Sequence, residues 1–144
     1  MKKNAKGKIA AVITIGLSIV QMTAVKVFAP VCTGMLTLEN GNETYMKCHY
    51  TGQILFYLSI LLLVNGCLFL IMGQRMSAGV MSIVIGLLSI LVTGSGILGV
   101  GVCATGNMAC GMTAGWARVC GGAAIITGII TLILVYRAER KEQI

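Results

Sequence analysis

Four long apolar stretches, separated by short polar segments, dominate the pattern of the chain. They run over residues 9–28, 52–72, 78–101 and 119–136. Each is close to the roughly 20 apolar residues that a helix needs to cross a bilayer core of about 30 Å. Because an isolated span satisfies its backbone hydrogen bonds only as a helix, we expect four transmembrane helices. The sequence therefore predicts an all-α integral membrane protein, with one four-helix transmembrane domain over residues 1–144.

The first stretch has a second interpretation, because its basic start is also typical of a cleaved signal peptide. Its apolar region is long for a signal, and Pro30 follows Ala29, the one small residue suited to cleavage. Cys32 follows Val31, which does not fit a lipid-attachment motif. We therefore expect the first helix to be retained.

The composition agrees with a membrane protein. Hydrophobic residues make up 57% of the chain and charged residues only 10%, whereas a soluble domain has about a quarter of its residues charged. Four spans leave no room for a soluble catalytic domain. The sequence shows no phosphate-binding loop, no HExxH and only one histidine, so we expect neither an enzyme of those kinds nor a cofactor.

The basic residues predict the orientation. Eight of the eleven lie in segments on one side of the predicted membrane: Lys2, Lys3, Lys6, Lys8, Arg75, Arg137, Arg140 and Lys141. Lys26, Lys47 and Arg118 lie on the other side. Since cytoplasmic loops are enriched in Lys and Arg, we expect both termini in the cytoplasm and the chain in the inner or plasma membrane. The net charge of +7 then reflects topology and unspecific attraction to anionic lipid, and we expect no nucleic-acid partner.

The two halves of the chain, residues 1–72 and 73–144, share a motif. Met-x-Cys-x-x-Thr occurs before the second stretch (Met46, Cys48, Thr51) and again before the fourth (Met108, Cys110, Thr113). Another cysteine precedes each copy, Cys32 in the first half and Cys103 in the second. The pattern predicts a duplicated helical hairpin whose copies are parallel repeats.

These motifs, in MKCHYTGQ and CATGNMAC, resemble those of a bacterial family of small four-span membrane proteins of unknown function. The resemblance covers nearly the whole chain and implies no established activity. It does imply a membrane partner, because the family is associated with gene neighbourhoods of ABC-type exporters. The second copy departs from the first in having Gly111 where His49 stands, which argues against a role that needs a histidine in both loops.

The four cysteines of the predicted outer loops leave three interpretations open. Structural disulfides would join Cys32 to Cys48 and Cys103 to Cys110. Both closed loops would be short, and closing a loop of about 15 residues contributes roughly 3 kcal/mol. A thiol–disulfide relay would use the same thiols, although neither loop has Cys-x-x-Cys. A Cu(I) site would use soft ligands, and the loops offer Met46, Cys48, His49, Met108, Cys110 and Met112.

Small residues form a stripe on each of the last two stretches. The third stretch has Gly79, Ser82, Gly86, Ser89, Thr93 and Gly96, and the fourth has Gly121, Ala124, Gly128 and Thr131. Such spacing lets helix backbones approach closely, so we expect these two helices to pack on each other. The alternative is that one stripe docks a helix of a partner.

Strongly polar residues within the spans are few, and none of the four acidic residues lies in a span. Transport pathways usually contain paired ionisable groups, so we do not expect transport by this chain alone. Gln21 and Asn65 are expected to bind each other's helices or a backbone carbonyl. The sequence as a whole predicts a scaffold or accessory subunit of a larger membrane complex, with the redox relay and Cu(I) handling as alternatives.

Overall fold

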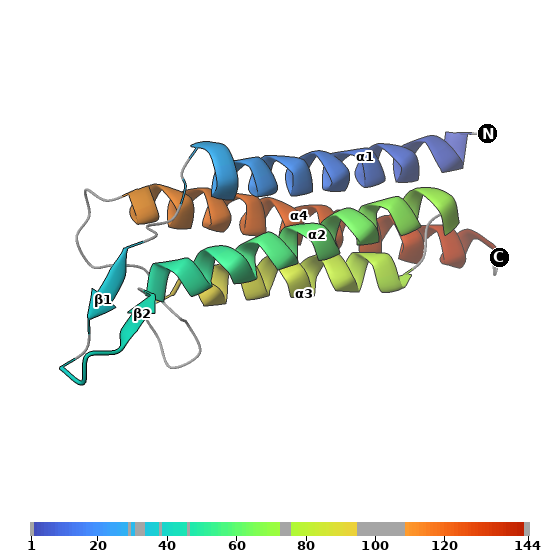
Figure 1. The fold of residues 1–144 in the computed structure, drawn as a ribbon. Coiled ribbons are helices and arrows are strands. Elements are labelled where there is room, and N and C mark those ends of the chain that lie inside the picture. Colours follow the sequence, from blue (N-terminus) through green and yellow to red (C-terminus); the bar gives the residue numbers. More distant parts are fainter. Residues whose placement is uncertain are drawn as a thin grey trace.

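The computed structural model describes residues 2–28, 30, 34–37, 39–45, 47–72, 76–94 and 109–142. These residues form the helices α1 (Lys2–Thr23), α2 (Lys47–Met72), α3 (Met76–Val92) and α4 (Ala109–Glu142). A π-helix, η1 (Ala24–Phe28), continues α1, and the strands β1 (Met35–Thr37) and β2 (Glu43–Tyr45) pair between η1 and α2. Successive helices run in opposite directions, so the start of α1 and the end of α4 lie together, at the end opposite the strands (Figure 1). We call the end of the bundle that holds the chain termini the terminal end, and the end that holds the strands the hairpin end.

In the described part of the chain, three helices are long and apolar enough to cross a membrane, over Gly7–Val27, Lys47–Met72 and Gly111–Arg140. The fourth, α3, is also apolar but has 17 residues, which gives it a length of about 26 Å. Large hydrophobic side chains are exposed on all four helices, from Val12 on α1 to Ile133 on α4. These features confirm a helical, membrane-type architecture and are compatible with a multi-pass protein.

Two helices begin before the apolar stretches that they contain. The helix α2 begins at Lys47 and not at residue 52, and α4 begins at Ala109 and not at residue 119. Hydropathy marks where a segment becomes apolar, whereas a helix begins where its backbone starts to hydrogen-bond, and no proline interrupts either polar extension. The third stretch was expected to reach residue 101, but α3 ends at Val92 and residues 95–108 lie outside the described part.

A short antiparallel hairpin of β1 and β2 accompanies the helical bundle. Met35 pairs with Tyr45 and Thr37 pairs with Glu43, on either side of a turn that contains Gly41. Gly41 has a φ of 75°, a left-handed conformation that glycine adopts without a steric cost. The exposed strand β2 ends two residues before α2 begins, so the hairpin is held directly against the start of that helix.

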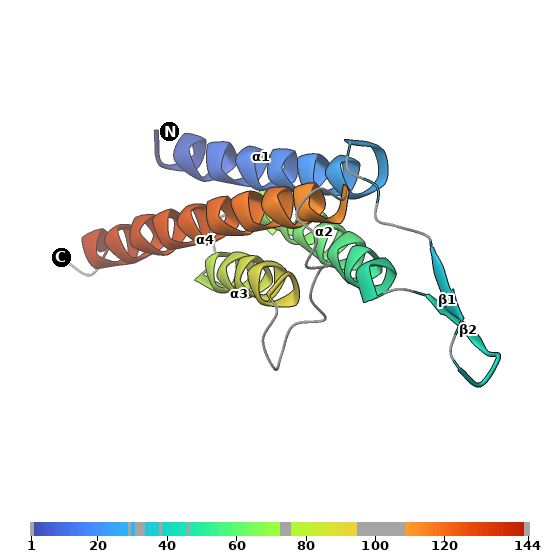
Figure 2. The ribbon, with the colours of Figure 1, turned by 90° about the vertical axis from the view of Figure 1, so that its left-hand side faces the viewer.

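The bundle core consists of small layers between the helices. At the terminal end, Ala10, Ala11, Phe69 and Ala78 pack together; the middle layer contains Leu58, Leu62, Ile85 and Ala124; and Val25, Leu55 and Ala117 pack at the hairpin end. Contacts are most extensive between α3 and α4 and next between α1 and α2. Figure 2 shows α4 between α1 and α3.

Candidate functional site

The two cysteine motifs start α2 and α4 at equivalent positions. Cys48 and Cys110 are each the second residue of their helix, and Thr51 and Thr113 are each the fifth. Cys48 is 0% exposed and both threonines are 1% exposed. Because residues three apart share a helix face, Cys48 and Thr51 are buried together. The motifs were predicted to lie in loops, and this placement is wrong for Cys48, Thr51, Cys110 and Thr113.

The remaining members of the two motifs cannot be placed from the structure. Cys32, Met46, Cys103 and Met108 lie outside the described residues, and only the backbone of Cys110 is described. The disulfides Cys32–Cys48 and Cys103–Cys110 therefore stay predictions.

His49 joins the hairpin to α2 through aromatic contacts. Its ring stacks on Tyr45 of β2, with 4.5 Å between centroids and 19° between planes, and it meets Tyr50 edge-on at 5.9 Å. Its Nε2 lies 3.2 Å from Nε2 of Gln53, one turn along α2. The imidazole is thus held by the side chains of Tyr45 and Gln53, and its Nδ1 is buried without a hydrogen-bond partner.

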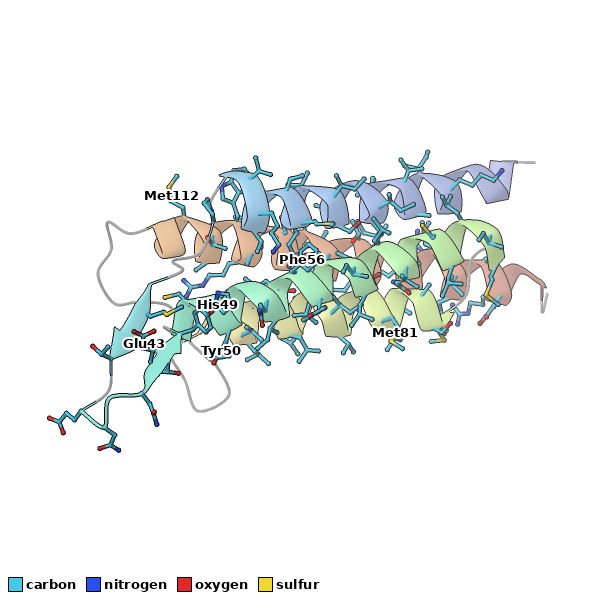
Figure 3. All side chains as sticks on the ribbon, viewed as in Figure 1. Glu43, His49, Tyr50, Phe56, Met81 and Met112 are labelled. Atoms are coloured by element: carbon cyan, nitrogen blue, oxygen red, sulfur yellow. The ribbon has the colours of Figure 1, made fainter. Side chains whose placement is uncertain are left out.

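Met112 and His49, two of the proposed Cu(I) ligands, are not brought together. Figure 3 shows Met112 pointing away from the bundle at the start of α4, whereas His49 lies at the start of α2 beside the hairpin. Met112 is 64% exposed. Within the described ranges, no group of three His, Cys, Asp or Glu side chains is placed to hold a metal ion.

Two basic side chains at the hairpin end bind neighbouring helices. Arg118 of α4 donates from Nη2 to the backbone oxygen of Thr93 at 3.2 Å and from Nε to its hydroxyl at 3.4 Å. Thr93 directly follows α3, so the guanidinium lies where that helix leaves its carbonyl oxygens without intrahelical partners. Lys26 of η1 lies over the ring of Phe56 on α2, with its Nζ 4.9 Å from the centroid.

The polar side chains inside the bundle fasten helices to each other. The buried ones of the described chain are all neutral serines, threonines and Gln21. Most hydroxyls donate to a carbonyl one turn back in their own helix, as Ser59 does to Leu55 at 2.7 Å. Gln21 Nε2 of α1 donates to Oγ of Ser89 on α3 at 3.3 Å.

Asn65 of α2 also fastens its helix to α3. Its Nδ2 donates to Oγ of Ser82 at 2.9 Å and to the backbone oxygen of Ala78 at 3.2 Å. The expectation that Asn65 binds a backbone carbonyl is confirmed. Gln21 was expected to bind the helix of Asn65 or a carbonyl, and its amide nitrogen instead binds the hydroxyl of Ser89 on α3.

The small-residue stripes lie at the contact between α3 and α4. A Cβ atom built on Gly86 would stand 2.6 Å from the backbone oxygen of Gly121, and one on Gly121 would stand 2.8 Å from that of Gly86. Gly79 and Gly128 form a second reciprocal pair, at 3.1 and 2.8 Å. The other stripe residues of the described range, Ser82, Ser89, Thr93, Ala124 and Thr131, are buried. Gly96 lies outside that range. The two backbones therefore touch, which only residues without bulky side chains permit.

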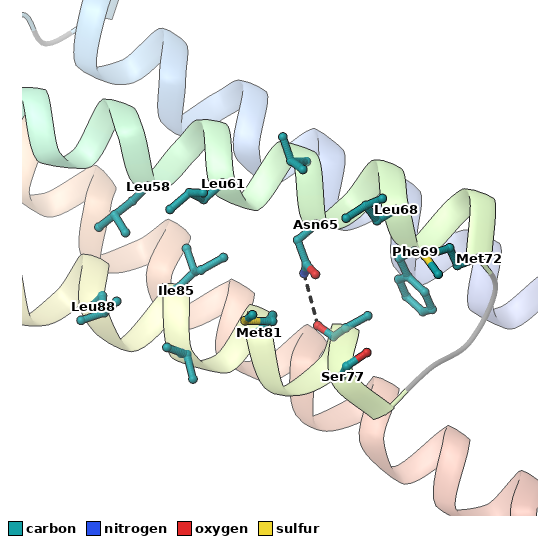
Figure 4. Close-up of a pocket in the computed structure, with 13 residues that line it drawn as sticks. Leu58, Leu61, Asn65, Leu68, Phe69, Met72, Ser77, Met81, Ile85 and Leu88 are labelled. Carbon is teal, nitrogen blue, oxygen red and sulfur yellow. Dashed lines mark hydrogen bonds between the residues drawn. The ribbon is translucent and has the colours of Figure 1, made fainter.

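A groove of about 470 Å³ opens between α2 and α3 (Figure 4). Leucines, methionines and other apolar side chains make up nearly all of its lining: Leu58, Leu61, Val64, Leu68, Phe69, Met72, Ala78, Met81, Val84, Ile85 and Leu88. Asn65 and Ser77 are its polar members. The amide nitrogen of Asn65 donates to α3, and no residue that the structure describes donates a hydrogen bond to its carbonyl oxygen. The groove thus combines an apolar surface with the polar groups of Asn65 and Ser77.

Comparisons with known proteins identify a family but no characterised relative. No curated protein matches the chain, and no solved structure does. One family model, described as "Domain of unknown function (DUF4418)", matches residues 12–136, a range that runs from α1 to the last turns of α4. The expected membership in a family of unknown function is thereby confirmed: the chain belongs to the DUF4418 family.

Proposed function

We propose that this protein is an accessory subunit of a larger membrane complex and that a transmembrane helix of its partner docks in the groove between α2 and α3. The observation that carries the proposal is the groove itself, in which the carbonyl oxygen of Asn65 has no donor among the described residues. In hydrocarbon, an unpaired polar group costs free energy that a donor on another helix recovers.

The interior of the bundle supports a scaffold role. The polar groups of Gln21 and Asn65 bind α3, and the Gly86–Gly121 and Gly79–Gly128 contacts bring α3 and α4 together. These groups serve helix packing, and the buried side chains that the structure describes carry no charge. A bundle built in this way is suited to presenting a fixed surface to another protein.

The occupant of the groove is inferred from its chemistry. Leu61, Val64 and Met81 are about half exposed, so the groove faces the surroundings of the bundle and not its core. An acyl chain would fill the apolar surface but would offer no donor to Asn65. A helix with a serine, threonine or amide side chain at that depth would cover the apolar surface and also donate a hydrogen bond to Asn65. We propose ABC-type exporters as the first candidate partners, on the resemblance described in the sequence analysis.

The proposal also covers the hairpin end of the bundle. We assign it to the outer face, with disulfides Cys32–Cys48 and Cys103–Cys110 bracing two copies of one helical hairpin. The complete burial of Cys48 supports a structural role, because a relay or a Cu(I) carrier must expose its sulfur to the molecule it serves.

Photo-crosslinking from the groove tests the proposal. A photoreactive residue replaces Met81 in the groove, and the matched control replaces Ile130, which is similarly exposed on α4 outside the groove. We expect position 81 to give one adduct with a larger membrane protein in native membranes, and position 130 to give none. The adduct should weaken with Asn65→Leu, which keeps the volume but removes the amide.

Two results would contradict the proposal. Adducts with lipid alone at position 81 would mean that the groove is filled by acyl chains. An adduct of twice the 15.1 kDa chain mass would mean that the groove holds a second copy of this protein.

A further inference from the structure

A second groove, of about 370 Å³, lies at the terminal end of the bundle, where α3 begins and α4 ends. Its lining consists of Met76 from α3 and Leu132, Ile133, Tyr136, Arg137 and Arg140 from α4. The volume falls within the range of about 300–1,000 Å³ that is common for small-molecule sites. The proposed docking of a partner between α2 and α3 makes no use of it.

The residues of this groove change in character along α4. Leu132 and Ile133 are apolar, Tyr136 is amphipathic, and Arg137 and Arg140 are cationic. Spacings of three and four residues place them along one face of the helix. From Ile133 to Arg140 the helix rises by about 10 Å. The groove therefore has an apolar end toward the middle of the bundle and a basic end at its edge.

The apolar end of the groove is formed by a leucine that α3 holds in place. A Cβ on Gly79 of α3 would stand 2.9 Å from Cγ of Leu132, so this leucine packs directly on the α3 backbone. Met76 and Ile133 flank the groove and are each about half exposed.

The basic end carries two exposed guanidinium groups, those of Arg137 and Arg140. Among the side chains that the structure describes, which include that of Glu139, neither arginine has an ion-pair partner. The predicted apolar stretch of α4, residues 119–136, ends directly before Arg137, so both guanidinium groups lie at the predicted edge of the hydrocarbon layer. Tyrosine is common at that depth in membrane helices, and Tyr136 lies there.

From this arrangement we infer that the groove binds one anionic phospholipid. The guanidinium groups of Arg137 and Arg140 hold the headgroup phosphate, since the planar arginine fork matches phosphate oxygens. Tyr136 lies at the level of the glycerol, and an acyl chain packs on Leu132, Ile133 and Met76. Basic sites of this kind between membrane helices bind anionic headgroups.

Native mass spectrometry of the purified full chain tests the inference. The probes are phosphatidylglycerol and phosphatidylcholine of equal chain length, which share the acyl chains and differ in net headgroup charge. We expect wild-type protein to retain one phosphatidylglycerol in preference to phosphatidylcholine. Arg137→Gln and Arg140→Gln should each lower that preference about fivefold. Lys8→Gln, which removes one exposed charge at the same end but outside the groove, should leave it unchanged.

Three outcomes would overturn the inference. Unchanged preference in both arginine variants would show that the groove does not select the headgroup. An equal loss in Lys8→Gln would show diffuse attraction to the charge of the terminal end. Displacement of the lipid by millimolar inorganic phosphate or glycerol phosphate would show an anion site that does not need an acyl chain.

Discussion

Alanine at Gly121 should destabilise the bundle relative to alanine at Gly122. A Cβ at position 121 would stand 2.8 Å from the backbone oxygen of Gly86 and 3.0 Å from Cγ1 of Ile90. Ordinary contact begins at 3.4 Å, so α3 and α4 would have to separate by 3.4 − 2.8 = 0.6 Å at this point. At Gly122, the next residue of the same helix, nothing lies within 4 Å of such an atom.

The comparison isolates the cost of the close contact. Both substitutions gain the same helix propensity, about 1 kcal/mol for Gly→Ala, and this gain cancels between the two variants. Forcing an extra carbon into a packed contact costs typically about 1–3 kcal/mol. The free energy of unfolding of Gly121→Ala should therefore be about 1–3 kcal/mol below that of Gly122→Ala.

Unfolding in mild detergent, followed by helical circular dichroism, measures the difference. Gly86→Ala should behave like Gly121→Ala, because its Cβ meets the backbone oxygen of Gly121 at 2.6 Å. The double variant should lose less unfolding free energy than the two single variants lose together, since the first substitution already separates the backbones. Equal unfolding free energies for Gly121→Ala and Gly122→Ala would refute the close α3–α4 contact.

Three further predictions concern the hairpin end. A cysteine at Asn42 should react with a membrane-impermeant maleimide in whole cells, and one at Lys8 only after permeabilisation; the reverse pattern would overturn the proposed orientation. In protein isolated under thiol-blocking conditions, Cys48 and Cys110 should be alkylated only after reduction, and their alkylation in most molecules beforehand would contradict the structural disulfides. Arg118→Met removes both hydrogen bonds to Thr93, so amide exchange in the last turn of α3 should accelerate about two- to fivefold; unchanged exchange would show that these bonds do not stabilise the helix end.

Hydropathy predicted the helices well where the chain is uniformly apolar. The small-residue spacing of Gly79, Gly86, Gly121 and Gly128 also pointed to the contact that the structure shows, because that spacing repeats with the helix turn. Hydropathy missed the first turns of α2 and α4, where polar or small residues are already helical. It consequently placed Cys48 and Thr51 in a loop, although they are buried on a helix.

Two features needed information that a hydropathy pattern does not contain. The hairpin had a local signal, an Asn40-Gly41 pair flanked by β-prone Thr37 and Tyr45, but it is too short to appear as a periodic strand. The hydrogen bonds of Gln21 and Asn65 to α3 depend on the relative depth of three helices. A one-residue change in a helix boundary moves a side chain by about 1.5 Å along the axis and by about 100° around it, so these partners could not be assigned from sequence.

Co-purification of groove variants tests most directly whether a partner helix occupies the groove between α2 and α3. Met81→Trp fills the groove, whereas Ile130→Trp adds the same bulk to α4 outside it; the two replaced side chains are 56% and 48% exposed. The measurement is the amount of partner per chain after purification in mild detergent. We expect wild type and Ile130→Trp to retain a stoichiometric membrane partner, and Met81→Trp to lose it while unfolding at the wild-type midpoint. Retention of the partner by Met81→Trp, equal loss in both variants, or the absence of any stoichiometric partner from wild type would contradict the account.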